Sequence, residues 1–226
     1  ENNSLALSGL SNLVVCRVKR KLPMKELKLP QNLAGELQEL YALLAVDYDA
    51  VAERIGLACT GCPDNCCDSY FLHFTYTEWA YLWQGLQELE SQALLAVEKK
   101  AKDYVLASQH ALTQGKRPQL MCPLNEKGLC QLYNHRLMIC RAHGVPASLT
   151  MPNGQKQTFP GCFRCQEMVE LQSRSEGEVP LADRTAALRR LVQVEQSLLG
   201  IGLKRYPKIR FTIAEMITHG PPQALD

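Results

Sequence analysis

Nine of the ten cysteines of this 226-residue chain fall into two short segments, and this grouping constrains its fold more than any other feature. Within the run ACTGCPDNCCDSY, the first segment carries Cys59, Cys62, Cys66 and Cys67. The second segment carries Cys122, Cys130, Cys140, Cys162 and Cys165, while Cys16 stands apart. Each segment contains a Cys-x-x-Cys pair, in which a tight turn can direct two thiolates at one metal.

Metal binding accounts for this bunching better than disulfides do. Many cysteines in a small secreted protein indicate a disulfide framework. This chain is long enough to bury a core without such cross-links, and it shows amphipathic helical patterns. A third explanation, cysteines that merely fill an apolar core, leaves the spacings unexplained. We therefore predict metal, with disulfides and core cysteines as the alternatives.

The predicted ligands are the nine grouped cysteines, namely Cys59, Cys62, Cys66, Cys67, Cys122, Cys130, Cys140, Cys162 and Cys165. They suffice for two four-thiolate sites with one thiol left over. Zinc and iron–sulfur clusters both accept four thiolates, so ligand type alone does not separate them. The set is all cysteine and lacks the regular paired spacing of a zinc ribbon, which favours one or two [4Fe-4S] clusters, with zinc as the alternative.

The segments around the cysteines predict helices. Apolar residues recur at steps of three and four from Gln31 to Gly56, where glycine suits a helix end. Thr75 and Glu78 have the spacing of a capping box, and so do Thr212 and Glu215. A third helix is expected over 91–114, with Leu94, Val97, Ala101, Val105 and Leu112 inward. A C-terminal stripe contains Leu181, Leu188, Leu191 and Leu198.

Residues 116–165 show no sustained hydrophobic period and are rich in Pro, Gly and Asn. The sequence PNG at 152–154 predicts a tight turn between two short extended pieces. So long an irregular stretch needs something to organise it, and a metal centre would do so. The expected fold is mainly α, with helices packed around an irregular cysteine-rich metal-binding region and at most a short β-hairpin. We predict one domain over 1–226, with the metal module at about 55–165.

Composition narrows the classes of partner. The net charge of +2 gives no general attraction for nucleic acid, so no nucleic-acid binding is expected. No apolar run approaches the ~20 residues of a membrane span, and we expect a cytoplasmic location. Since the chain begins at Glu1, we expect its true start, with or without a targeting segment, to have been removed.

The run CTGCPDNCC at 59–67 resembles the signature of the YkgJ-type CxxCxxxCC family, which is described as zinc- or iron-chelating. The likeness continues in FTYTEWAYL and in CPLNEKGLCQLYNHRLMICRAHGVP, so it covers about residues 55–165. One departure is Leu137, where the family usually has proline after arginine. Membership implies metal binding and says little about a reaction. Flagellin lysine methylases carry a similar cysteine module with an iron–sulfur cluster, which offers an analogy for catalysis.

Three functions follow as hypotheses. The first is an iron–sulfur protein for electron transfer or for binding a small molecule at iron; the second is a zinc protein that binds a protein partner; the third is a cluster-dependent group-transfer enzyme. Other catalytic motifs are missing from the sequence, so any reaction depends on the metal. Residues expected beside the ligands or at a bound anion are Arg136, Arg141, His143 and Tyr133. His73, by contrast, has no ligand-like neighbours in the sequence.

Overall fold

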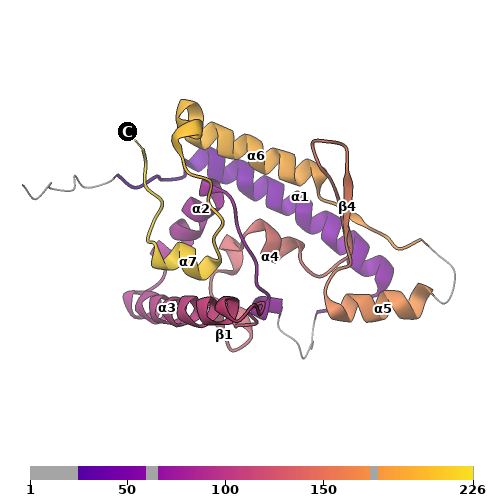
Figure 1. Ribbon diagram of the computed structural model, residues 1–226. Coiled ribbons are helices and arrows are strands. Elements are labelled where there is room, and N and C mark those ends of the chain that lie inside the picture. The colour runs from indigo at the N-terminus through magenta and orange to yellow at the C-terminus, as the bar shows by residue number, and fades with distance from the viewer. Residues whose placement is uncertain (1–24, 60–65, 174–177, 226) are drawn as a thin grey trace, which may run out of the picture.

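The computed structural model of the protein describes residues 25–59, 66–173 and 178–225, and the fold is mainly α, as predicted (Figure 1). The helices are α1 (Gln31–Ile55), α2 (Tyr76–Gln87), α3 (Ser91–Thr113), α4 (Met138–Ala142), α5 (Phe163–Ser173), α6 (Thr185–Leu199) and α7 (Ile213–Thr218). Short 3-10 helices lie at Cys66–Asp68, Tyr133–His135 and Gly200–Arg205. Within the described ranges, none of the helices has the length and apolar character to cross a membrane.

The β structure is larger than the single hairpin that was expected. Strands β1 (Asn125–Glu126) and β2 (Leu129–Cys130) form one antiparallel pair. Strands β3 (Ala147–Thr150) and β4 (Lys156–Phe159) form the predicted hairpin, and the PNG sequence turns the chain with Gly154 at φ +83°. The expectation was wrong because β5 (Ala182–Asp183), far along the chain, pairs in parallel with β3 and makes a third strand.

Helix α1 matches its sequence pattern. Its periodic apolar face is buried, and it ends at Gly56, whose positive φ of 69° lets its N–H reach the carbonyls of Ala52 and Glu53. Figure 1 shows α1 and α6 side by side along one side of the molecule, and the two helices pack against each other. The same α1 also contacts α4 and α5, so it lies against the middle and the end of the cysteine-rich segment 116–165.

Helix α2 is buried almost all round, with ten of its twelve residues inaccessible to solvent. Its two indole N–H groups, on Trp79 and Trp83, donate to the carbonyl of Met216 in α7 at 3.0 and 3.1 Å. Tyr81 packs edge-on against Tyr41 of α1, with ring centroids 5.9 Å apart. An apolar helix in this position lies at the centre of the main core.

The two predicted capping boxes have different outcomes. Thr212 and Glu215 form the complete reciprocal box at the start of α7. Thr75 accepts the N–H of Glu78 as expected, but the reciprocal bond from the Thr75 backbone to Glu78 does not form, so the full-box prediction was wrong at α2. The Glu78 carboxylate turns inward instead, where it accepts the Met138 N–H at 2.7 Å and the Tyr41 hydroxyl at 3.3 Å.

Two leucines that the sequence patterns placed in buried stripes are exposed to solvent in the structure. Leu112, in the last turn of α3, is 48% exposed, whereas Val97, Ala101 and Tyr104 form the buried face of that helix. Leu181 precedes α6 and is also largely exposed. Both lie at or beyond a helix end, where the neighbouring helices no longer cover the stripe.

The irregular segment 116–165 contributes directly to the main core. Leu124, Leu132 and Leu137 are 2%, 5% and 0% exposed and pack with α2 and α7. Val145 and Ala147 are equally buried in a second cluster with the end of α1. Segment 116–165 thus contains buried apolar residues, although it has no periodic hydrophobic pattern that would predict them. Their burial contributes to ordering the segment, alongside any metal.

Glu195 of α6 fastens α6 to the start of α2. Its carboxylate accepts the backbone N–H groups of Tyr76 and Thr77 at 2.9 and 2.8 Å, and the Thr77 hydroxyl at 2.7 Å. These are N–H groups of the first helical turn, which have no partner inside the helix. A carboxylate there also interacts favourably with the helix dipole.

We predict that Glu195→Ala lowers the free energy of unfolding by roughly 2 kcal/mol, because it removes charge-assisted hydrogen bonds from partly buried donors. Urea denaturation followed by circular dichroism measures this. The matched control is Glu39→Ala, an exposed glutamate on α1 whose loss should change stability by less than about 0.5 kcal/mol. Equal losses in the two variants would contradict the role given to Glu195.

Candidate metal centre

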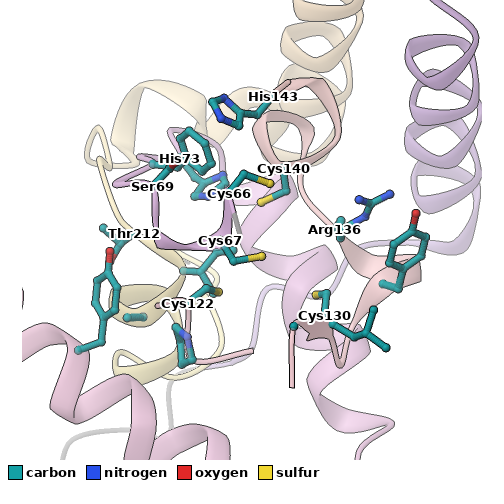
Figure 2. A pocket seen from close by; sticks show the side chains of 18 residues that line it. Cys66, Cys67, Ser69, His73, Cys122, Cys130, Arg136, Cys140, His143 and Thr212 are labelled. Atoms are coloured by element: carbon teal, nitrogen blue, oxygen red, sulfur yellow. The ribbon is translucent and has the colours of Figure 1, made fainter. Parts of the chain in front are cut away.

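Five of the predicted cysteine ligands line one cavity of about 210 Å³. They come from separate pieces of chain: the 3-10 helix Cys66–Asp68, the loop after α3, strand β2 and helix α4. The five are Cys66, Cys67, Cys122, Cys130 and Cys140. Figure 2 shows these side chains around the cavity, which we call the thiol cavity.

Backbone hydrogen bonds bring the two cysteine segments together. The N–H of Cys122 donates to the carbonyl of Cys67 at 2.9 Å, which joins the segments although α2 and α3 separate them in sequence. The described parts of the two cysteine segments therefore lie together. No disulfide joins any two of the eight described cysteines. Cys62 and Cys16 lie outside the described residues, so the prediction for Cys62 stays open.

The electrostatics of the thiol cavity single out Cys67. The Cys66 thiol donates a hydrogen bond that lowers the pKa of Cys67 to about 6, and the Asn125 amide and the charge of Arg136 act in the same direction. The pKa of Cys66 is raised in turn, because its proton is held by Cys67. Within this coupled pair, Cys67 is therefore the thiol that loses its proton more readily.

The other three thiols of the cavity are shifted in the opposite direction. Burial raises the pKa of Cys122 to about 12 and also raises the pKa values of Cys130 and Cys140, and the nearby Cys67 adds to the shift of each, so the thiolate forms are disfavoured. Deprotonating several of them together requires positive charge inside the cavity. A metal ion or cluster supplies that charge, and its binding releases the thiol protons.

Three of the four residues expected beside the ligands also line the thiol cavity. The Arg136 guanidinium lies 3.8 Å from the centre of the Tyr133 ring, and the His143 ring packs on Phe71 at 4.9 Å between centroids. Arg141 is used differently. Its guanidinium donates to backbone carbonyls, including Asn134 O at 2.7 Å, and lies over the Tyr41 ring behind the cavity.

The other described cysteines form a second group near the end of α1. The Cys162 sulfur accepts the N–H of Cys165 at 3.4 Å at the start of α5. The Tyr48 hydroxyl oxygen is 3.7 Å from the Cys59 sulfur. Tyr48 is also close enough to Cys162 for the two side chains to interact electrostatically. We call Cys59, Cys162 and Cys165 the second thiol group.

Glycine allows the chain to approach closely beneath the second thiol group. Gly161 has φ +85°, and a Cβ there would lie 2.5 Å from the Gly144 carbonyl oxygen. Burial raises the pKa of Cys165 to about 11, so its thiol is neutral in the absence of a cation. The close contact of Gly161 with the Gly144 carbonyl fixes the backbone just before this Cys-x-x-Cys turn.

No set of three or more Cys, His, Asp or Glu side chains in the described ranges is arranged to hold a single metal ion. The thiols of the cavity surround a volume rather than one point. His73 lines the same cavity, although its sequence neighbours gave no sign of this. His73 is positioned there by a β-bridge to Phe211, which is 138 residues away in the chain. Sequence spacing cannot reveal a contact over that distance.

Comparison of the chain with protein-family models, with curated proteins and with solved structures finds no match.

The 3-10 helix Tyr133–His135, which leads from β2 to the Arg136 side of the cavity, rests on a glycine of α2. A Cβ at Gly85 would lie 2.5 Å from the His135 ring, whereas one at Gly35 of α1 would meet nothing within 4 Å. Tyr81 of α2 also donates to the carbonyl of Asn134 at 2.9 Å. The contact at Gly85 therefore fixes this part of the cavity wall.

We predict that Gly85→Ala destabilises the protein by roughly 1–3 kcal/mol through overpacking, despite the better helix propensity of alanine. The control Gly35→Ala should instead stabilise it by about 0.5–1 kcal/mol, because α1 gains propensity without a clash. Urea unfolding of both variants measures the two signs. A stabilising Gly85→Ala would show that His135 is not held against α2.

Proposed function

We propose that the thiol cavity binds an iron–sulfur cluster of the [4Fe-4S] type, which the protein uses for electron transfer or for binding a small molecule at iron. The observation that carries the proposal is the convergence of five cysteines from separate chain segments on one cavity. Four thiolates are the usual ligands of such a cluster. The cluster, when bound, supplies reversible one-electron chemistry and Lewis acidity.

The size of the cavity supports a cluster of several ions. Its volume of about 210 Å³ is more than ten times the ~10–15 Å³ that one water requires, and a single ion takes up about as much room as a water. Thiols distributed around such a volume suit a polynuclear group better than one ion. The donors are thiols, which are the preferred ligands of iron–sulfur clusters.

The chain prepares the cavity for an anionic cluster. The Cys66 hydrogen bond lowers the pKa of Cys67 to about 6, so this ligand gives up its proton more readily than the other thiols of the cavity. Arg136 places a permanent positive charge at the cavity wall, where it offsets the negative charge of thiolates and sulfide. Leu129 and Tyr133 line the cavity and are largely exposed, so a small molecule has a route to the site from solvent.

The second thiol group supports a second candidate role, the structural metal centre that the sequence also predicted. The N–H to sulfur bond within Cys162-x-x-Cys165 fixes these thiols at the start of α5, and Tyr48 lies within reach of both Cys59 and Cys162. A metal there would join the end of α1 to α5 and to the β3–β4 hairpin. Zinc suits such a structural role, because it accepts thiolates and has no redox chemistry.

Anaerobic purification followed by iron, sulfide and zinc analysis tests the main proposal. We expect a brown protein with broad visible absorption that bleaches on reduction. The double variant Cys130→Ser/Cys140→Ser should lose this absorption, while Cys162→Ser/Cys165→Ser should retain it. Cys16→Ser is the control that leaves metal content unchanged. A colourless protein with stoichiometric zinc would overturn the iron–sulfur proposal.

We also predict that metal removal loosens residues 116–165 before the helices. Metal–thiolate binding contributes on the order of 10 kcal/mol at a structural site, more than the few buried leucines of this segment supply. Hydrogen exchange on the loaded and the chelated protein should show lost protection there and retained protection in α1 and α6. Equal protection of 116–165 in both states would mean that its apolar anchors alone order the segment.

A further inference from the structure

His73 is held rigidly in the wall of the thiol cavity. It lies between the 3-10 helix Cys66–Asp68 and α2, and its backbone pairs with Phe211 through two hydrogen bonds of 2.7 and 3.0 Å. The residue is 2% exposed. Figure 2 shows it close to Cys66. A histidine fixed by its backbone on a cavity wall presents its ring with little freedom.

The two ring nitrogens of His73 have different surroundings. Nδ1 is 4.0 Å from Oε1 of Glu78, which is too long for a hydrogen bond but near enough for the carboxylate to attract a proton on that nitrogen. Nε2 is buried and has no hydrogen-bond partner within the part of the chain that the structure describes. A buried polar atom without a partner requires an explanation, and a bound group is one.

Burial favours the neutral form of the ring, because His73 is 2% exposed and a charged imidazole would lose its hydration there. A neutral imidazole has one N–H and one free lone pair. Oε1 of Glu78 accepts hydrogen bonds from Tyr41 and Met138 and lies 4.0 Å from Nδ1, so this acceptor oxygen favours the proton on Nδ1. The lone pair is then on Nε2, in the arrangement that carboxylate–histidine–metal sites use.

We propose that His73 is a nitrogen ligand, through Nε2, of the metal group bound in the thiol cavity, and that Glu78 is the positioning residue that selects this tautomer. This inference rests on the proposed cluster-binding function and deepens it, because it replaces one of the four thiolate ligands by a histidine nitrogen. Histidine in place of cysteine raises the reduction potential of an iron–sulfur centre. Such a ligand would therefore set the direction in which electrons flow through the site.

Pulsed EPR on the dithionite-reduced protein, reconstituted anaerobically with iron and sulfide, tests the ligand directly. We expect a strongly coupled ¹⁴N signal from the wild type that is lost in His73→Leu. His143→Leu, which removes the other histidine that lines the cavity, should keep the signal. A ¹⁴N signal that persists in His73→Leu, or that is lost only in His143→Leu, overturns the inference.

Two further variants separate ligation from a structural role. His73→Cys keeps a ligand at the position, so it should retain iron, lose the ¹⁴N coupling and lower the midpoint potential. Glu78→Gln removes the charge that selects the tautomer, so it should weaken or shift the ¹⁴N coupling. An unchanged coupling in a Glu78→Gln protein that still binds the cluster would overturn the positioning role.

The outcome for the wild type separates this inference from the proposed function. A wild-type cluster without ¹⁴N coupling overturns only the His73 ligand. A wild type that binds zinc in place of a cluster overturns the proposed function, and zinc-edge X-ray absorption then tests the ligand by imidazole scattering in the wild type and its loss in His73→Leu. A wild type that binds neither metal overturns both.

Discussion

The buried carboxylate of Glu78 is the interaction on which the rest of the site depends. It lies in the first turn of α2, is 4% exposed, and binds α1 through Tyr41 and the first N–H of α4 through Met138. Burial raises the pKa of Glu78, and the three hydrogen bonds that it accepts oppose that shift. Since a buried charge is tolerated only when it is so satisfied, the helices that supply the donors must hold their positions.

The thiol cavity follows from that arrangement. Helix α4, fixed at its start by Glu78, carries Cys140 to the cavity, and the 3-10 helix before it rests on α2 at Gly85. On the other side, the loop from Cys66 to α2 is clamped by the pairing of His73 with Phe211. The walls of the cavity thus belong to the same packed core as α2 and α7. Rigid walls fix the spacing of the thiols before any metal arrives.

The sequence indicated which cysteines are candidate ligands, but it did not indicate how they separate into two groups. The Cys-x-x-Cys spacings and the irregular segment identified the candidate cysteines, and five of the eight described ones line one cavity. The grouping of Cys66 and Cys67 with one set and Cys59 with another did not follow from spacing. Neighbours in a loop point to different sides according to backbone conformation, which local sequence leaves open. His73 escaped notice for the same reason, because its partners lie in α2 and near residue 211.

The sequence alone determined the long helices and their ends, since periodic leucines, Gly56 and the Thr212–Glu215 box act over a few residues. It also determined that thiol chemistry is concentrated in two segments. The tertiary structure decided where Glu78 points, which thiols share a cavity, and that β5 joins the hairpin. Each of these depends on contacts between residues far apart in the chain, whose free energy arises only when the core is packed around them.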